Sequence, residues 1–311
     1  MRSTLRIGVL ACAAMVGTMN AASAQTPLKV IVFPGLSNFS IFAAQHKNLF
    51  AKHGIDIELT NTPNSDVMRN GLAKGNYQIA QGGVDNAVAM VELAKADAII
   101  VTGGDNGYNR IFVQPEINSL ADLRGKTVVV DAPNTAFGLL LYKALKDNGL
   151  NKGDYAVKPV GATTARLEAM TKDKANAMAA VINPPFTFRA REAGLKDMGP
   201  ATKTIGAYQS DGAFVMRDWA KANSGALVRY ISAYVEGRRW ALDPANKEEA
   251  IALLAERLKL TPQLAAKFDM EGFKNTLKLR AEIEGQWGGT PPSPEKYIDL
   301  SYYDRAMAGI R

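Results

Sequence analysis

The sequence predicts an α/β protein with two similar lobes and a helical C-terminal region. Three observations lead to this fold class. Short apolar or β-branched segments alternate with helical segments between residues 28 and 193, a pattern typical of βαβ units. The order of these segments occurs twice along the chain. Two short glycine-containing stretches, at 103–112 and 206–214, lie at the two ends of the second repeat and are expected to join the lobes.

The first repeat is predicted from apolar strands and amphipathic helices that end at glycine. Residues 28–33 are apolar, and Phe39, Phe42, Ala43, His46 and Phe50 share one side of the helix that follows. Strands are expected at 28–33, 55–60, 77–80 and 98–102, and helices at 39–52, 62–75 and 84–94, with a tight loop at 81–83.

The second repeat begins with the clearest βα unit of the chain. Thr127 to Val130 are β-branched, residues 131–135 interrupt the strand at Pro133, and Asn134 or Thr135 can cap the next helix. That helix has one apolar face and ends at Asn148-Gly149. The remaining expected elements are strands at 155–160 and 177–182 and helices at 164–171 and 186–193, with a loop at 183–185.

The last third of the chain is predicted to be mainly helical. Short strands are expected at 205–209 and 213–216, before residues 227–235 present a strongly amphipathic face. A surface loop at 288–292 and a final helix at 297–307 follow. Trp219, Trp240 and Trp287 are expected to pack in the core.

Composition excludes several classes of protein. The chain has 311 residues, of which 47% are hydrophobic and 22% charged, and these are globular values. Its formal charge of +7 is not gathered into a basic run, so nucleic acid is not an expected partner. No stretch after the N-terminal segment is long and apolar enough to predict a membrane span.

The N-terminus has the pattern of a secretory signal peptide. Arg2 and Arg6 precede an apolar run at 7–17, and residues 22–24 form a small-x-small cleavage site. We expect cleavage after Ala24 and a periplasmic location. Cys12, the only cysteine, lies inside this segment; a lipoprotein box at 9–12 is the alternative interpretation. The mature chain then has no cysteine that could act as a thiolate nucleophile or as a thiolate ligand of a metal.

Motifs of common enzyme classes are absent. H-E-x-x-H, G-x-S-x-G and G-x-G-x-x-G do not occur, and Gly125-Lys126-Thr127 lacks the first glycine of a phosphate loop. His46 and His53 belong to or follow the first helix, where dipole stabilisation is a sufficient role. We therefore expect no catalysis, no cofactor and no metal.

Several segments together resemble a family of secreted receptors. They are A-K-H-G-I-D at 51–56, L-A-K-G at 72–75, S-L-A-D-L-R-G-K at 119–126 and N-P-P at 183–185. In this order they resemble the nitrate/sulfonate/taurine and thiamine-pyrimidine-precursor binding proteins of ABC importers. The resemblance implies a type II periplasmic-binding-protein fold with a ligand cleft between the lobes. It also implies an ABC permease with its ATPase subunits as partners.

The two crossings divide the chain into lobe 1, residues 25–108 and 211–311, and lobe 2, residues 109–210, after removal of the signal peptide at 1–24. By the resemblance, the ligand lies between these lobes. The ligand is expected to be a small organic anion, sulfonate-, nitrate- or carboxylate-like. Free N–H groups after Pro133 are suited to an anion, although an ordinary capped turn explains the same residues. The expected cleft residues are Ser37, Asn38, Phe39, Gly82, Gly83, Asp85, Asn86, Tyr108, Asn134, Thr135, Phe137, Asn183, Phe186, Tyr208 and Asp211.

Several alternatives to this hypothesis remain at this point. Asp85 and Asp211 add negative charge and are suited either to an amine or to capping a helix and a turn. The resemblance also allows a receptor for a pyrimidine or aromatic ligand, a sensing subunit, or an enzyme of thiamine-pyrimidine synthesis. Such enzymes are intracellular and carry a cysteine-rich iron-binding motif, which the predicted signal peptide and cysteine-free body argue against.

Overall fold

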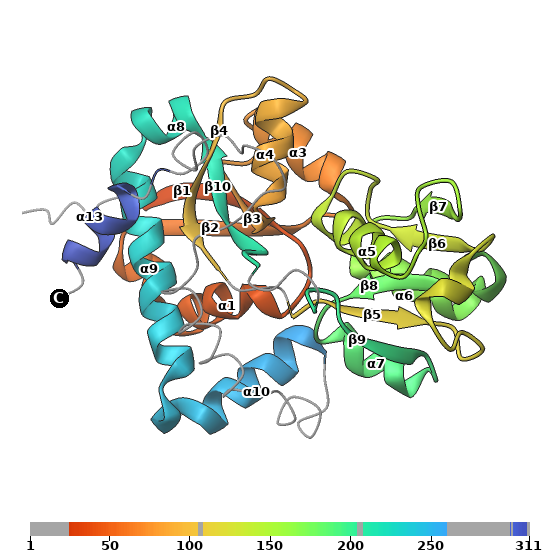
Figure 1. Cartoon of the computed structure of the whole chain (residues 1–311). Helices are drawn as coiled ribbons and strands as arrows, with labels where there is room; N and C mark the ends of the chain where they lie inside the picture. The colour runs from red at the N-terminus through yellow and green to blue at the C-terminus, as the bar shows by residue number, and fades with distance from the viewer. Residues whose placement is uncertain (1–24, 105–107, 204–207, 260–298, 300, 310–311) are drawn as a thin grey trace, which may run out of the picture.

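The chain folds into two α/β lobes, each around its own five-stranded sheet (Figure 1), which confirms the predicted fold class. The computed structural model describes residues 25–104, 108–203, 208–259, 299 and 301–309. The predicted signal peptide at 1–24, the predicted loop at 288–292, Trp287 and most of the predicted strand at 205–209 lie outside the described residues.

The sheet of the first lobe has the strand order β2-β1-β3-β10-β4. β1 is parallel to β2 and β3, and β10 is antiparallel to β3 and β4. Its strands are β1 (Thr26–Val32), β2 (Ile55–Asn61), β3 (Ile79–Gly83), β4 (Ala98–Gly103) and β10 (Asp211–Met216).

The sheet of the second lobe has the order β7-β6-β8-β5-β9. β6 is parallel to β7 and β8, and β5 is antiparallel to β8 and β9. The strands are β5 (Arg110–Val113), β6 (Thr127–Val130), β7 (Ala156–Pro159), β8 (Ala179–Ile182) and β9 (Lys196–Pro200). In each lobe the antiparallel strand, β10 or β5, is the first strand after the chain crosses from the other lobe. The predicted repeat therefore extends to strand order.

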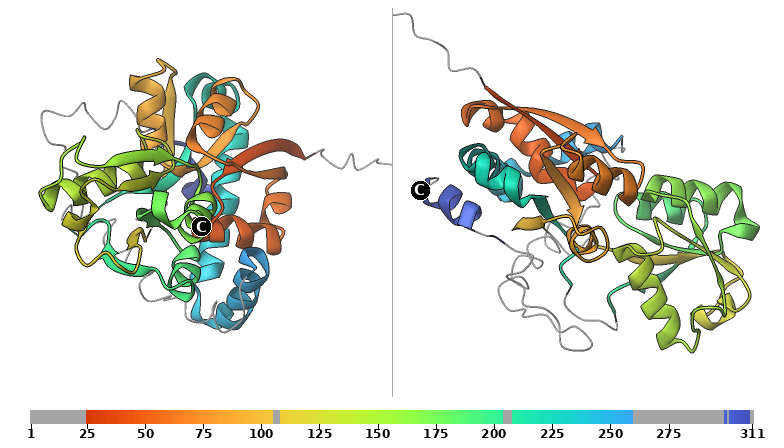
Figure 2. Two further views of the ribbon diagram at one scale, coloured as in Figure 1. Left: turned by 90° about the vertical axis from the view of Figure 1, so that its right-hand side faces the viewer. Right: turned by 90° about the horizontal axis from the view of Figure 1, so that it is seen from above.

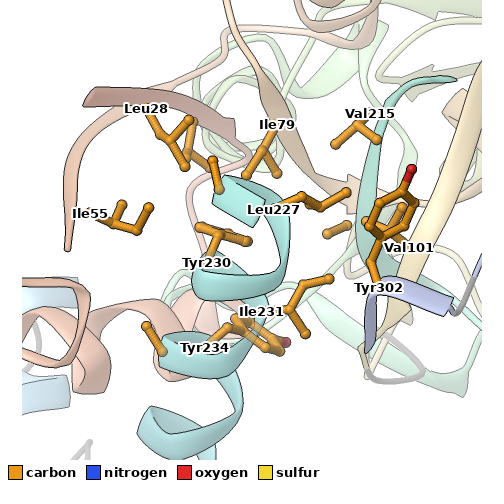
Figure 3. Close-up of a cluster of buried hydrophobic side chains, with 14 of the residues drawn as sticks. Leu28, Ile55, Ile79, Val101, Val215, Leu227, Tyr230, Ile231, Tyr234 and Tyr302 are labelled. Carbon is orange, nitrogen blue, oxygen red and sulfur yellow. The ribbon is translucent and has the colours of Figure 1, made fainter. Parts of the chain in front are cut away.

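Alternating side chains of the first sheet face two different helical layers. Val30 and Val32 join the core that includes α1, α2, α9 and α13, whereas Ile31 joins the core with α3 and α4. Figure 3 shows the first core, with Tyr230 and Ile231 of α9 packed near strand residues. The helices are α1 (Phe39–His46), α2 (Leu49–Lys52), α3 (Ser65–Ala73), α4 (Asp85–Glu92), α8 (Arg217–Ala222), α9 (Ser224–Leu242), α10 (Lys247–Leu258) and α13 (Ser301–Gly309), with short 3-10 turns η1 (Leu36–Asn38) and η4 (Pro244–Asn246).

The second sheet is layered in the same way. Val128 and Val130 pack with α5, and Val129 packs with α6 and α7. These helices are α5 (Ala136–Asp147), α6 (Thr163–Lys172) and α7 (Phe186–Glu192), with 3-10 turns η2 (Leu120–Leu123) and η3 (Lys174–Asn176). Seen from above, the two lobes form separate bodies side by side (Figure 2).

Three local predictions differ from the structure. The helix expected at 39–52 is divided into α1 and α2, because Asn48 adopts a left-handed backbone with φ 53°. Gly82 and Gly83, expected in a loop, continue β3 because β10 pairs with them. β9 was not predicted; its half-exposed residues carry no alternating apolar pattern, and pairing with β5 fixes it.

Candidate functional site between the lobes

The two lobes meet through loops that follow parallel strands. The backbone N–H of Leu36, after β1, donates to the carbonyl of Pro184, after β8, at 3.3 Å. The N–H of Ala162, after β7, donates to the carbonyl of Pro63, after β2, at 2.8 Å. Ligands of open α/β sheets bind beyond the carboxyl ends of strands. We call these loops, residues 33–38, 61–65 and 83–86 of one lobe and 131–136, 160–163 and 183–185 of the other, the interlobe interface.

Asp85 connects the first lobe to a helix of the second. It is the first residue of α4, and its Oδ2 accepts a hydrogen bond from the backbone N–H of Ala136, the first residue of α5, at 2.6 Å. A carboxylate at a helix N-terminus is stabilised by the unpaired N–H groups there. Burial nevertheless raises the pKa of Asp85 to about 6, with a smaller contribution in the same direction from the nearby Asp131 charge.

Asp131 makes the reciprocal connection. It follows β6 in the second lobe, is buried, and its Oδ2 accepts from the hydroxyl of Ser65 at 2.5 Å. Ser65 is the first residue of α3, whose N-cap Asn64 accepts from Val67. Burial raises the pKa of Asp131 as well, against the lowering effect of Ser65 and of the Arg166 charge. Each lobe therefore places a carboxylate at the start of a helix in the other lobe.

Arg166 holds the second lobe's side of this interface together. Its guanidinium is completely buried and donates to the carbonyls of Val181 and Gly161, at 3.0 and 2.7 Å, and to the hydroxyl of Thr163 at 2.6 Å. It also lies 4.4 Å from the centre of the Phe137 ring, a favourable cation–π distance. Burial lowers its pKa to about 10, so it stays charged at neutral pH.

The predicted cleft residues of the second lobe take part in this network or border it. Thr163 donates from its hydroxyl to Oδ1 of Asn183. Asn134 accepts at Oδ1 from Arg69 of α3, at 3.3 Å. Thr135 is the N-cap of α5: its hydroxyl donates to Ala132 at 2.9 Å and accepts from Gly138 at 3.5 Å. The predicted capped turn at 131–135 is thus confirmed, and its first helical N–H is bonded to Asp85.

The predicted residues of the first lobe lie close to the interface. Ser37 donates from its hydroxyl to Oδ2 of Asp211 at 2.9 Å. Asn38 is buried and donates to the carbonyl of Phe33 at 2.7 Å. Asn86 donates to the carbonyl of Gly83 at 3.1 Å. Gly82 is packed so closely that a Cβ there would lie 3.2 Å from the Phe33 ring.

Tyrosines occur at both crossings between the lobes, as predicted. Tyr108 adopts a left-handed backbone with φ 47°. Tyr208 packs partly against the second lobe's core, and burial, with the charges of Asp85 and Asp211, raises the pKa of its hydroxyl.

Two of the predicted cleft residues have their side chains in a lobe core. Phe39 is 1% exposed and packs with α10 in the first lobe. Phe186 is 7% exposed and packs with Phe112 and Val129 in the second. Their positions at the start of α1 and α7 place their backbones near the interface.

Sequence reasoning missed Ser65, Arg69, Asp131, Thr163 and Arg166. Arg166 did leave a signal: Thr163, Arg166 and Met170 are the buried positions of α6 and recur at i, i+3 and i+7. A charged residue at a buried helical position needs partners. Asp131 follows a buried strand directly, which was a weaker signal of the same kind.

The described residues contain no group of three or more His, Cys, Asp or Glu side chains arranged to hold a metal ion. Both histidines lie on the first lobe and pair with glutamates: His46 with Glu249 and His53 with Glu236, each at 2.7 Å. In the part of the chain that the structure describes, no helix has the length and apolarity of a membrane span.

Comparison with known proteins assigns the sequence to a family. The model of the family described as "NMT1/THI5 like" matches residues 37–247, which include both lobes. The chain belongs to the NMT1/THI5-like family. A protein of Brachyspira hyodysenteriae that is named as an ABC transporter periplasmic binding protein is 26% identical to this NMT1/THI5-like protein over 246 residues, covering 73% of this chain and 68% of the relative.

Solved structures share the fold of the NMT1/THI5-like chain. The nitrate-binding protein NrtA of Synechocystis PCC 6803 matches with a TM-score of 0.72 at 14% identity, over 92% of this chain and 89% of that one. The alkanesulfonate-binding protein SsuA of Xanthomonas axonopodis pv. citri, bound to MOPS, matches with a TM-score of 0.67 at 18% identity, over 83% and 85%. The desulfurization enzyme DSZB matches at 0.59 and 12% identity, over 92% and 100%. The fold is therefore that of the periplasmic binding proteins, as the resemblance implied.

Proposed function

We propose that this protein is a secreted solute receptor that binds a small molecule between its lobes and delivers it to an ABC permease. The observation that carries the proposal is the interlobe interface itself. Buried polar groups at strand ends of one lobe bond to the other lobe, as Asp85 does to Ala136 and Asp131 to Ser65. Polar groups that converge between two bodies are typical of ligand sites.

The proposed binding surface combines the predicted cleft residues with the network around Arg166. In this proposal lobe 1 comprises residues 25–108 and 211–311 and lobe 2 comprises residues 109–210, and the described part of the chain passes into lobe 2 once and returns once. Glycine-containing crossings absorb backbone rotation, so ligand binding is proposed to shift the lobes toward a closed arrangement. The relative named as an ABC transporter periplasmic binding protein supports a permease and its ATPase as partners.

A non-enzymatic role is part of the proposal, although one structural neighbour is an enzyme. His46 and His53 belong to the first lobe and are committed to Glu249 and Glu236. After removal of residues 1–24 the chain has no cysteine. The side chains at the interface therefore offer neither an imidazole base nor a thiolate nucleophile.

The test uses protein purified from its native periplasm under mild conditions. The protein is denatured, and the small molecule released is identified by mass spectrometry and returned to refolded protein in calorimetry. We expect a stoichiometric ligand and a smaller radius of gyration in solution scattering when it is bound. Conversion of the returned molecule to a product would contradict the receptor role, as would retention of residues 1–24 in the periplasmic protein.

A further inference from the structure

Negative charge gathers at the interlobe interface around Asp85, Asp131 and Asp211. Among the described residues, Arg69 and Arg166 lie near these carboxylates, and both are already engaged. Arg166 donates from all three guanidinium nitrogens to its own lobe. Arg69 pairs with Asp66 at 2.7 Å and reaches Asn134. Neither arginine donates a hydrogen bond to Asp85 or Asp131, which instead accept from Ala136 and Ser65.

Buried oxygens without a hydrogen-bond partner among the described residues occur at the same place. Oδ1 of Asp85 and Oδ1 of Asp131 are both buried and unpartnered, while Oδ2 of each bonds across the interface. Unpaired buried oxygens of charged groups cost free energy. Each of the two carboxylates therefore has one oxygen that a positively charged hydrogen-bond donor would satisfy.

Two neighbouring amides add oxygens of the same kind. Asn86 and Asn109 are at most 3% exposed, and the Oδ1 of each has no partner among the described residues. The amide nitrogen of Asn86 donates to the carbonyl of Gly83, which can only accept, so the orientation of this amide is fixed. Asn109 donates to Ser210, whose carbonyl accepts from Val84 beside Asp85. The unpartnered atoms of Asp85, Asp131 and Asn86 are all acceptors, and in its present orientation the Asn109 amide adds a fourth.

An anion is a poor match to this arrangement. The N–H at the start of α5, where the sequence suggested an anionic ligand, is taken by Asp85. An anion that used this N–H would have to displace that carboxylate and would then lie beside it and Asp131. A cation with several N–H groups would donate to the oxygens that lack partners and offset both charges.

We propose that the ligand presents a compact cationic nitrogen group, an amine or an amidine, to the carboxylates of Asp85 and Asp131. This inference rests on the proposed receptor function and names the ligand class of the same site. The lobes must part to admit such a group, since the unpartnered oxygens are buried in the present arrangement. Asn86 and Asn109 would supply further acceptors for its N–H groups.

The test compares three probes with the same ring and different charge: benzamidine, benzoate and benzenesulfonate. Calorimetry with the full mature chain is expected to show binding of benzamidine at millimolar concentration and at least about tenfold weaker binding of both anions, since hydrogen bonds to charged groups are worth about a factor of ten or more. Asp85→Asn and Asp131→Asn are each expected to weaken benzamidine binding by about tenfold. Asp173→Asn, which removes an equal charge from an exposed pair with Lys158, should bind as the wild type.

Both aspartate variants keep an acceptor oxygen, and a thermal melt checks that they fold. If one variant does not fold, the binding measurement on the other variant tests the proposal. Tighter binding of either anion, equal loss in Asp173→Asn, or no benzamidine binding would overturn the ligand class. None of these outcomes would overturn the receptor function, because the ligand released from native protein tests that independently. Release of a purely anionic ligand would overturn the cationic class and leave the receptor role intact.

Discussion

Arg166→Met tests whether the buried guanidinium stabilises the second lobe. Methionine keeps most of the apolar stem but removes the charge and every donor. Three acceptors, the carbonyls of Val181 and Gly161 and the hydroxyl of Thr163, lose the donor that Arg166 supplies. Asp131 loses a nearby positive charge that lowers its pKa. Removing one partner from a buried ionic network typically costs about 3–5 kcal/mol, and we expect a loss in this range.

The assay is urea unfolding followed by circular dichroism at neutral pH, with Arg124→Met as the matched control. Arg124 lies in the same lobe, its side chain is 60% exposed, and it pairs with Asp154. An exposed pair is worth at most about 1 kcal/mol. Equal losses of unfolding free energy in the two variants would contradict the view that the hydrogen bonds of Arg166 stabilise the second lobe. A loss below about 1 kcal/mol for Arg166→Met would do the same.

Two further predictions concern packing and pH. Gly237→Ala should destabilise the protein by about 1–3 kcal/mol in the same urea assay, because its Cβ would lie 2.5 Å from the carbonyl oxygen of Ser40 in α1. Gly225→Ala in the same helix is the control. Its Cβ would have only Arg229 nearby, at 3.5 Å, so this variant should be neutral or stabilising. The pKa of Asp85 is raised from 3.8 to about 6, so its protonated form stabilises the fold and this contribution is lost as pH rises from about 4 to about 6. Thermal melts should therefore show Asp85→Asn gaining stability relative to wild type across this window, and a constant difference would contradict the burial of Asp85.

Local chemistry was sufficient to predict most of the elements and their order. β-Branched residues at 127–130 formed a buried strand, and Thr135 capped the helix that follows. Both results depend on contacts within a few residues, where steric preference and side-chain capping act directly. The repeated order of segments also predicted two lobes, because each βαβ unit has to bury its own sheet. The family resemblance then implied the fold, which the NMT1/THI5-like match bears out.

Only the tertiary structure determined which residues pair across the interlobe interface. Asp85 and Ala136 are 51 residues apart and Ser65 and Asp131 are 66 apart, and no local pattern pairs them. β9 exists because β5 offers it hydrogen-bond partners, not because of its own composition. The free energy of a buried charge depends on which groups the fold brings within a few ångströms. For that reason the chain shows an aspartate at position 85, but only the packed lobes show that its carboxylate takes the helix terminus at which the sequence suggested a ligand.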